Sequence, residues 1–355
     1  RRDALGPDGG IEWGHAEALA YATLLEDGVA IRLTGQDSER GTFAHRHAVL
    51  HDADTGEEYT PLEHVRDARA GFEVRNAPLT ETAALGFEYG YATTRPDALV
   101  LWEAQFGDFV NVAQVIVDQF IMSGRTKWGD ESRLTLLLPH AYEGSGPEHS
   151  SARLERFLKG AAEDNCTIVY PTTAAQCFHM LRRQALAPER RPLIVMTPKS
   201  LLRLKDAASN IDDLTHGTFI KIIDDAGVAD YRDDISRVIL CSGKVYYDLV
   251  RHPEHTPEDG TAIVRLEQLY PFPTETLART LAGYPALEEI VWAQEEPANM
   301  GAWRSIRHRL EMAAPSVRLR YAGRPWRASP SEGYPPDHKI EQERLVRDAL
   351  GLAHR

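Results

Sequence analysis

The chain has 355 residues, of which 43% are hydrophobic and 26% are charged, and its formal net charge at pH 7 is −13. This composition is ordinary for a globular protein, and the length suggests two domains with sizeable cores. The acidic balance argues against a nucleic-acid-binding surface and against a surface for anionic membranes. No apolar run in the sequence approaches the roughly 18–20 residues that a membrane span needs.

The cysteines and the first residues bear on the cellular compartment. The sequence has three cysteines without CxxC spacing, namely Cys166, Cys177 and Cys241. This pattern favours reduced core thiols in a cytoplasmic protein, or in the mitochondrial matrix of a eukaryote, and no metal site is predicted on the chain. The first ten residues, RRDALGPDGG, are polar and lack the apolar core of a signal peptide, so we interpret them as a linker from a longer protein.

Strands and helices alternate from the start of the chain. The apolar stripe at 12–26 predicts a helix, and residues 29–34 predict a strand that ends at Gly35-Gln36-Asp37. The polar segment SERGTFAHRH that follows is predicted to be a loop. Its three basic residues have two interpretations, as a binding site for a carboxylate or phosphate or as packing and subunit contacts: His45, Arg46 and His47.

An acidic turn at 79–83 precedes the Ala- and Gly-rich helical segment AALGFEYGYA, where the charge of Glu81 would favour the positive helix end. Residues 98–102 are an apolar run short enough for a buried strand, and a polar-aromatic loop and then a helix follow it. Ligands of open α/β sheets bind at the carboxyl ends of strands. This pattern predicts a pocket for a flat heterocycle; the alternative is a helix-terminal acid beside core aromatics.

The next predicted strand, at 133–138, leads into a loop that carries a histidine. Gly144, Gly146 and Pro147 predict a tight loop, and a helix is expected to begin near Ala152 with Ser150 or Ser151 as its cap. His149 stands at this junction of loop and helix, beside amides that suit anions. Two further strands, at 166–170 and 193–197, flank a predicted helix at 174–186.

A second alternation of strands and helices begins at Arg237. The predicted strands are VILCSGK, AIVRLEQL, EIVWAQEE and VRLRYAG, with helices near 244–251, 275–283 and 301–311. The fold class is therefore α/β, with two doubly wound, mostly parallel-sheet domains. The predicted organisation is a linker at 1–10, a first domain at 11–200, a polar connector at 201–234 and a C-terminal domain at 235–355.

Five segments of the sequence carry a resemblance to a known family. They are GQDSERGTFAHRH (35–47), LTETAALGFEYGYAT (79–93), LWEAQFGDFVNVAQ (101–114), GSGPEHSSARLERFL (144–158) and RPLIVMTPKSLLR (191–203). They closely resemble the thiamine-diphosphate-dependent 2-oxoglutarate dehydrogenases, the decarboxylating first component of that complex. The resemblance runs from about Ile11 to the C-terminus, and it covers the transketolase-like pyrimidine-binding domain and the C-terminal domain of such an enzyme.

The resemblance implies roles for five residues. Glu81 matches the glutamate that hydrogen-bonds the far nitrogen of the cofactor's aminopyrimidine and drives activation. Phe106 and Phe109 match the aromatic wall, and Gln105 is grouped with them as cofactor-binding. His149 matches the histidine of the GPEHS loop in the active site. The implied reaction is oxidative decarboxylation of 2-oxoglutarate, with succinyl transfer to a lipoyl group on the acyltransferase of the complex.

The family binds the diphosphate and its Mg²⁺ through a GDG…NN segment on another domain, and this sequence has no such segment. We therefore expect the Mg²⁺ ligands on a separate diphosphate-binding half, which would be a partner of this chain in a homodimeric enzyme. The chain alone is expected to be inactive. The alternatives are a β-type subunit of a pyruvate or branched-chain 2-oxoacid dehydrogenase, or a non-catalytic regulatory module that binds nucleotide or acyl-CoA.

The resemblance also indicates a possible effector site. Some actinobacterial relatives are activated by acetyl-CoA at the junction of these two domains, and three residues match polar and basic positions of that site: Thr167, Arg183 and Gln268. Other positions, including an arginine pair that would meet phosphates, are replaced here by Thr218, Lys221, Glu275 and Thr276. An acidic residue opposes a polyanion, so these replacements argue against an active effector site.

Overall fold

The computed structural model describes residues 3–6, 9–256 and 258–353. The chain divides into two compact units: the first contains residues 1–139, 165–167 and 172–219, and the second contains 140–164, 168–171 and 220–355. The domain limits given above remain a prediction. Within the predicted linker at 1–10, Asp3–Leu5 form a turn of 3-10 helix, and residues 1, 2, 7 and 8 lie outside the described residues.

The first unit is built on five parallel strands in the order β8-β6-β5-β1-β4. These strands are β1 (Ile31–Gly35), β4 (Phe72–Asn76), β5 (Leu99–Glu103), β6 (Thr135–Pro139) and β8 (Leu193–Thr197). All five residues of β5, β6 and β8 are buried. Continuous burial is expected where helices cover both faces of a parallel sheet, and it explains why these strands appear as unbroken apolar runs in the sequence.

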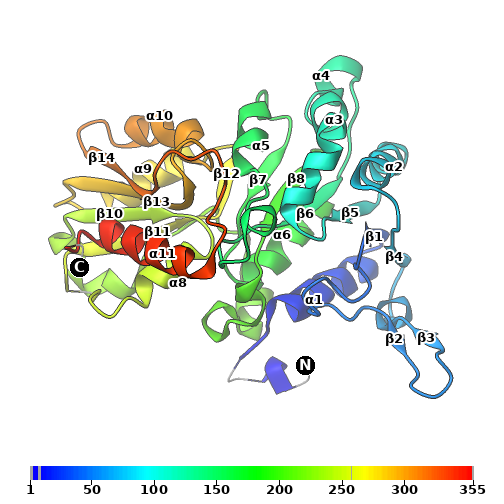
Figure 1. Ribbon diagram of the computed structural model, residues 1–355. Helices are drawn as coiled ribbons and strands as arrows, with labels where there is room; N and C mark the ends of the chain where they lie inside the picture. The colour runs from blue at the N-terminus through cyan, green and yellow to red at the C-terminus, as the bar shows by residue number, and fades with distance from the viewer. Residues whose placement is uncertain (1–2, 7–8, 257, 354–355) are drawn as a thin grey trace. The chain divides into compact units, whose positions relative to one another are not determined.

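Helices cover the two faces of this sheet (Figure 1). Helix α1 (Trp13–Glu26) packs against α6 (Ala174–Leu186) on one face, and α2 (Glu81–Thr94) packs against α3 (Gln114–Ile116) on the other. The smaller elements of the unit are the hairpin of β2 (Leu50–His51) and β3 (Glu58–Tyr59), α4 (Gly124–Trp128) and α7 (Ile211–Thr215).

The helix predicted to leave the loop after β5 is broken into short pieces. A 3-10 helix at Gly107–Ala113 is followed by α3, one π-helical turn at Val117–Ile121 and α4. The Asn111 side chain donates to the carbonyl oxygen of Asp108, at 2.7 Å, and to its carboxylate. Such local side-chain bonds compete with regular helix, and apolar periodicity alone does not reveal them.

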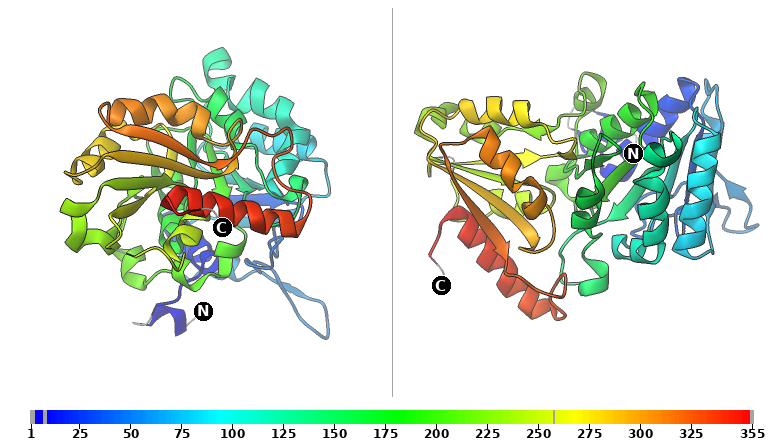
Figure 2. Two further views of the ribbon diagram at one scale, coloured as in Figure 1. Left: turned by 60° about the vertical axis from the view of Figure 1, so that its left-hand side comes forward. Right: turned by 90° about the horizontal axis from the view of Figure 1, so that it is seen from above.

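The second unit contains a five-stranded sheet in the order β14-β13-β10-β11-β9. Four strands are parallel: β10 (Arg237–Cys241), β11 (Thr261–Leu266), β13 (Glu289–Pro297) and β14 (Arg318–Arg324). Helices α8 (Val245–Val250) and α11 (Pro335–Leu350) cover one face, and α9 (Thr274–Ala282) and α10 (Trp303–Ala313) cover the other (Figure 2). The predicted α/β class, with mostly parallel sheets, is confirmed.

Three details of the second unit differ from the prediction. The connector contains β9 (Ile222–Ile223), which pairs antiparallel with β11. The strand predicted at 262–269 is interrupted at Glu267, and its second part, β12 (Gln268–Tyr270), pairs antiparallel with Ile168 and Val169 of β7 (Thr167–Val169). The prediction omitted α11, whose sequence is mostly polar; its buried apolar residues gather in the last two turns, at Leu345, Val346, Ala349 and Leu350.

The helix after the histidine loop, α5 (Leu154–Gly160), begins two residues later than predicted. Arg153 occupies the cap position with a positive φ of 57°, and no side chain caps the helix. Ser150 instead donates its hydroxyl to the carbonyl oxygen of Gly146, at 2.7 Å, and Ser151 accepts from the amide of Arg153. The two serines therefore shape the loop and do not cap the helix.

The prediction that the cysteines are core thiols is confirmed, because Cys166, Cys177 and Cys241 are buried and free. Burial raises the pKa of Cys166 to about 12, so this thiol stays protonated and inert near neutral pH. Within the described part of the chain, every helix is too short or too polar to cross a membrane.

Two residues of α11 provide a test of packing in the second unit. Leu345 is fully buried in the core formed by α8, α11 and the sheet, whereas Ile340 on the same helix is 66% exposed. We expect Leu345→Ala to lower the free energy of unfolding by about 2–5 kcal/mol, because it leaves a cavity. Ile340→Ala should change it by less than about 0.5 kcal/mol. Urea unfolding followed by tryptophan fluorescence, to which the buried Trp292 contributes, measures both; equal effects would contradict the packing.

Candidate active site

The register of the parallel strands brings three loops to one edge of the first sheet. Gly35, the last residue of β1, is the partner of Asn76 in β4 and of Glu103 in β5. The loops after these strands therefore leave the sheet side by side, where ligands of α/β proteins bind. A Cβ atom on Gly35 would lie 2.3 Å from the carbonyl oxygen of Glu103, so this close approach of β1 and β5 requires glycine.

Glu81 is held at the start of α2. It is the first residue of the helix, and Thr80 caps the helix by accepting the amide hydrogen of Ala83. Gln36, in the loop after β1, donates from Nε2 to Glu81 Oε1 at 3.0 Å. A carboxylate in the first helical turn interacts favourably with the helix dipole. The half-buried Glu81 side chain thus has a defined orientation.

The loop after β5 presents an amide and two aromatic rings. Gln105 donates from Nε2 to Asp37 Oδ2 at 2.7 Å, which ties this loop to the loop after β1. The rings of Phe106 and Phe109 meet edge to face, with centroids 5.7 Å apart, and Phe43 meets Phe106 in the same way at 5.6 Å. Edge-to-face contacts orient rings, and Phe106 and Phe109 stay half-buried, so part of each ring can contact a ligand.

The predicted residues Glu81 and Gln105 line one small pocket together with Gln36, which the sequence analysis did not assign to a site. Its lining also includes Gly35, Leu79 and Trp102. The cavity volume is only ≈ 10 Å³, so the pocket is a recess that can receive the edge of a ligand. The sequence contained one signal for Gln36, namely its position directly after the glycine that ends a predicted strand.

Arg46 lies beneath this site in a buried ion cluster that the sequence analysis left open. Its guanidinium donates to both carboxylate oxygens of Glu17 on α1, at 2.6 and 3.0 Å, and to both of Glu103, at 2.7 Å each. All three side chains are at least nine-tenths buried. For Arg46, packing within the chain is therefore the correct alternative. Bidentate pairs of this kind fix the planes of both partners.

The electrostatics of the cluster keep Glu103 charged. Burial alone would raise the pKa of Glu103, but the charge and hydrogen bonds of Arg46 outweigh burial and hold this pKa below its usual range. Glu103 immediately precedes Ala104 and Gln105. The ion cluster thus anchors the loop that carries Gln105 and Phe106 to helix α1.

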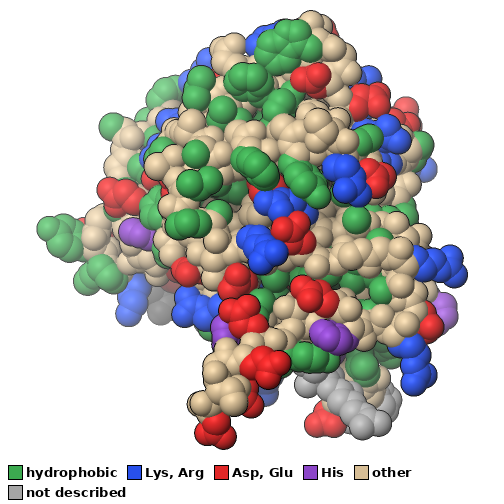
Figure 3. All heavy atoms as spheres, turned by 90° about the vertical axis from the view of Figure 1, so that its right-hand side faces the viewer, with side chains coloured by type: hydrophobic (Ala, Val, Ile, Leu, Met, Phe, Trp, Pro, Cys, Tyr) green, Lys and Arg blue, Asp and Glu red, His purple; other side chains and the backbone are tan. Residues whose placement is uncertain are grey.

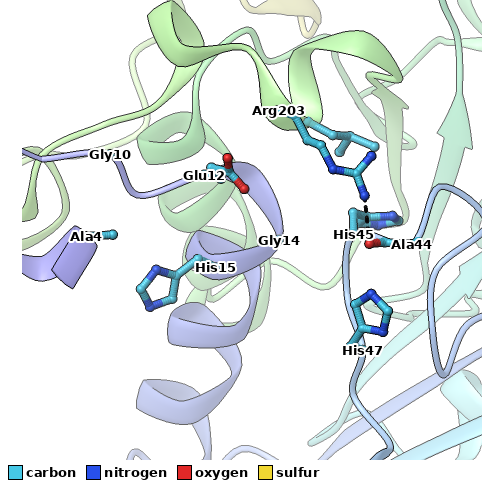
Figure 4. Close-up of a pocket in the computed structure, with 10 residues that line it drawn as sticks. Ala4, Gly10, Glu12, Gly14, His15, Ala44, His45, His47 and Arg203 are labelled. Carbon is cyan, nitrogen blue, oxygen red and sulfur yellow. Dashed lines mark hydrogen bonds between the residues drawn. The ribbon is translucent and has the colours of Figure 1, made fainter. Parts of the chain in front are cut away.

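A larger cavity of ≈ 410 Å³ lies beside the amino-terminal end of α1 (Figure 4). Its polar lining consists of Glu12, His15, His45, His47 and Arg203. Arg203 donates from Nη2 to the carbonyl oxygens of Phe43 and Ala44, both at 2.9 Å, and so holds the loop. Burial and the neighbouring charge of Arg46 lower the pKa of His45, which is therefore neutral at pH 7. Neither Glu81 nor Gln105 lines this cavity.

His149 belongs to the second unit. It ends a 3-10 turn at Pro147–His149, and its side chain is half-buried. Of the predicted effector residues, Thr167 and Arg183 lie in the first unit and Gln268 lies in the second. The Arg183 guanidinium lies 4.0 Å from the centre of the Phe219 ring, and burial lowers its pKa to about 10. The effector site stays a prediction.

Comparisons with known proteins identify the family. Residues 9–205 match the model of the transketolase pyrimidine-binding domain, and residues 208–350 match that of the 2-oxoglutarate dehydrogenase C-terminal region. The chain belongs to the transketolase pyrimidine-binding family. It corresponds in sequence to the C-terminal region of the 2-oxoglutarate dehydrogenase E1 components, which confirms the resemblance noted in the sequence.

Among its relatives, the 2-oxoglutarate dehydrogenase E1 component of Geobacillus sp. (strain WCH70) is 57% identical over 96% of this chain. The component of Haemophilus influenzae is 53% identical over 96%, and that of Bacillus subtilis is 53% identical over 99%. The aligned regions are 36%, 37% and 38% of these three relatives, respectively. The chain therefore spans a little over a third of the length of the curated relatives it matches.

The ion cluster gives a direct test of how the site is supported. Arg46→Met leaves Glu17 and Glu103 buried without their cation, and we expect a loss of about 3–5 kcal/mol in the free energy of unfolding at pH 7. Arg40→Met, in the same loop but with a largely exposed side chain, is the matched control and should cost less than about 1 kcal/mol. Denaturant unfolding of both variants provides the comparison.

The loss of stability in Arg46→Met should depend on pH. In the wild type, the contribution of Glu103 is present above its unfolded pKa of about 4.3 and is lost only as pH falls through the lower folded pKa. Without Arg46, burial should raise the folded pKa of Glu103, and protonation then relieves the buried charge. The loss of stability should therefore be smaller near pH 4.5 than at pH 7. A loss independent of pH would show that Glu103 is not the group affected.

Proposed function

We propose that this chain provides the pyrimidine-side half of the active site of a thiamine-diphosphate-dependent 2-oxoglutarate dehydrogenase. Such an enzyme decarboxylates 2-oxoglutarate oxidatively and passes the succinyl group to a lipoyl group of an acyltransferase. The observation that carries the proposal is the Glu81 carboxylate at the start of α2, oriented by Gln36 beside the loop of Phe106. The match of residues 208–350 to a 2-oxoglutarate dehydrogenase model favours this function over that of a β-type subunit.

The residues present are suited to the aminopyrimidine ring of thiamine diphosphate. This ring needs a carboxyl partner at its far nitrogen and apolar contact on its flat faces, and Glu81 and the half-buried Phe106 and Phe109 supply both. When bound, the cofactor supplies the nucleophilic carbon that attacks the 2-oxo group and the electron sink for loss of carbon dioxide. The recess of ≈ 10 Å³ beside Glu81 has room only for the edge of the aminopyrimidine ring. The flat faces of the ring would therefore contact Phe106, Phe109 and surface outside the recess.

The chain's own residues would act on one proton. Glu81 would share a proton with the ring nitrogen through one carboxylate oxygen. Gln36 donates a hydrogen bond to the other oxygen, Oε1, and so keeps the carboxylate in place. A positioned carboxyl group transfers a proton efficiently when its geometry is fixed in advance. The cap at Thr80 fixes the start of helix α2, where Glu81 lies, and the hydrogen bond from Gln105 to Asp37 fixes the loop beside it.

Magnesium is assigned to another domain in this proposal. Within the described residues, no group of three or more His, Cys, Asp or Glu side chains is arranged to hold a metal ion. Mg²⁺ in phosphate sites prefers carboxylate, water and phosphate oxygens in octahedral geometry. A diphosphate-binding half with the GDG…NN segment would supply these ligands.

The first unit has an apolar surface that suits contact with another polypeptide. Large apolar side chains that are more than half exposed occur around α2 and the segment after β5: Leu79, Phe87, Val112, Val115 and Trp128. Figure 3, which views the side where α2 lies, shows hydrophobic side chains gathered there. Clusters of this kind mark interaction sites. We assign this surface to a homodimer in which a diphosphate-binding half of the enzyme covers Phe106 and Phe109.

His149 would act after the cofactor is activated. Its loop position leaves the side chain half-buried, and an imidazole can donate or accept a proton near neutral pH. We assign to it proton transfer during decarboxylation or orientation of the lipoyl end. The buried free thiols support a reducing compartment, the cytoplasm or the mitochondrial matrix.

Glu81→Gln tests the assignment of the activating carboxylate. In an enzyme that contains both thiamine domains, this variant should bind the cofactor within a few-fold of the wild type, because size and contacts are kept. Exchange of the reactive ring proton with deuterated solvent should slow by at least ~100–10,000-fold, since the proton-transfer group is lost. Quenched exchange read by NMR measures this rate.

The control for this experiment is Glu57→Gln, which makes the same chemical change at an exposed carboxylate before β3. Its exchange rate should equal that of the wild type. Rapid exchange in Glu81→Gln would remove Glu81 from the proposed mechanism, whatever the overall turnover.

His149→Ala separates activation from later steps. Proton exchange on the cofactor should remain within a few-fold of the wild type, while carbon dioxide release or succinyl transfer slows by ~100-fold or more. His308→Ala, at an exposed histidine of the same unit, is the control and should leave both rates unchanged. If exchange slowed as much as carbon dioxide release, His149 would belong to activation or folding.

A further inference from the structure

The loop that carries His149 is closed at its base by the residues that flank it. The amide of Ala141 donates to the carbonyl oxygen of Ser150 at 3.0 Å, and the amide of Ala152 donates to His140 Nδ1 at 2.8 Å. Residues 141–151 therefore form a compact loop whose ends lie together. All of these residues belong to the second unit.

His140 is the side chain at the centre of this closure. It is 1% exposed, and its Nε2 lies 2.9 Å from Oε1 of Glu296 on β13. Since Ala152 donates to Nδ1, this nitrogen must carry a lone pair, and in the neutral ring the proton resides on Nε2. The two contacts thus require one tautomer, with Nε2 donating to Glu296.

Further contacts fix His140 against the rest of the second unit. The Tyr170 hydroxyl donates to the carbonyl oxygen of His140 at 3.1 Å, and its ring meets the imidazole edge to face at 5.3 Å. In helix α5, which follows the loop, the Glu155 carboxylate accepts the amide hydrogen of Gly301 at 3.0 Å. Strand β13 thus contacts the start of the loop, and the turn after β13 contacts the helix that follows it.

The turn before His149 contains two glycines and two hydrogen bonds to one carbonyl. Gly144 and Gly146 adopt positive φ angles, and the Ser150 hydroxyl and the His149 amide both donate to the carbonyl oxygen of Gly146, at 2.7 and 3.3 Å. His149 directly precedes Ser150, where the loop closes. The closure at His140 and Ser150 therefore holds the backbone that carries the imidazole of His149.

We propose that His140 is a positioning residue for His149: its ring accepts the amide hydrogen of Ala152, in the tautomer that the contact with Glu296 on β13 sets, and so fixes where the histidine loop presents His149. The functional part of this inference rests on the role proposed above for His149. The structural part does not, because the loop can be measured without cofactor or substrate.

Two substitutions of His140 each keep one of its two ring hydrogen bonds and remove the other. In asparagine the side-chain oxygen is two bonds from Cβ, as Nδ1 is in histidine, so His140→Asn keeps an acceptor for Ala152 and loses the donor to Glu296. In glutamine the amide is one bond further out, as Nε2 is, so His140→Gln keeps the donor and loses the acceptor. The proposal assigns loop anchoring to the Ala152 bond, so asparagine should rescue what glutamine loses.

The first measurement is amide hydrogen exchange of residues 144–152 in this chain. Exchange should be roughly tenfold faster in His140→Gln than in the wild type, because one buried hydrogen bond is lost, and close to wild type in His140→Asn. Exchange in β10 and β14 reports whether the unit remains folded. Equal protection of the loop in all three proteins would overturn the proposal.

The second measurement needs no variant to fold. Nitrogen-15 NMR of the unaltered chain should show His140 with a bare Nδ1 and a protonated Nε2 at pH 7, and the opposite tautomer would overturn the proposal.

The third measurement uses an enzyme that contains both thiamine domains. The His140→Gln variant of this enzyme should lose turnover, and the His140→Asn variant should keep it, with cofactor proton exchange unchanged in both. If the loop responds as expected while turnover does not, the function assigned to His149 fails and the anchoring by His140 stands.

Discussion

The parallel register around β1 is the constraint on which the rest of the first unit depends. Because Gly35 pairs with both Asn76 and Glu103, the loops after β1, β4 and β5 begin at one level of the sheet. The contact of Gln36 with Glu81 and the contact of Gln105 with Asp37 both follow from this alignment. A slip in register would turn every side chain of β1 to the opposite face and separate the carboxylate from the aromatic loop.

Buried ion pairs hold the segments that carry the proposed site residues. Bidentate bonds from Arg46 tie the end of β5 to helix α1, while Glu81 above them keeps partial access to solvent. The second unit repeats the arrangement at the carboxyl end of β13, where Glu295 pairs with Lys244 at 2.9 Å and Glu296 binds His140. In both units the charges that support the fold are buried, and the groups proposed for chemistry lie at a helix start, for Glu81, and on a loop, for His149.

Local pattern was enough to predict most strands and the longer helices, since buried parallel strands are continuous apolar runs and α6 has a clear apolar stripe. It also placed Glu81 at a helix start. It could not predict the partners of Arg46, because Glu17 and Glu103 come from distant segments that meet only through sheet register. The break between β11 and β12 and the broken helix after Phe109 likewise depend on tertiary contacts and local side-chain bonds.

The short strand β9 limits where this chain can be cut. Ile222 and Ile223 pair with Leu266 and Arg265 and so cover the backbone groups at the end of β11, on the outer side of its sheet. Uncovered sheet edges recruit strands from other molecules. A C-terminal piece that starts at residue 235 would leave this part of the sheet edge uncovered, whereas one that starts at residue 208 retains β9. The part of the connector from residue 220 onward thus belongs to the second unit and shields the end of β11.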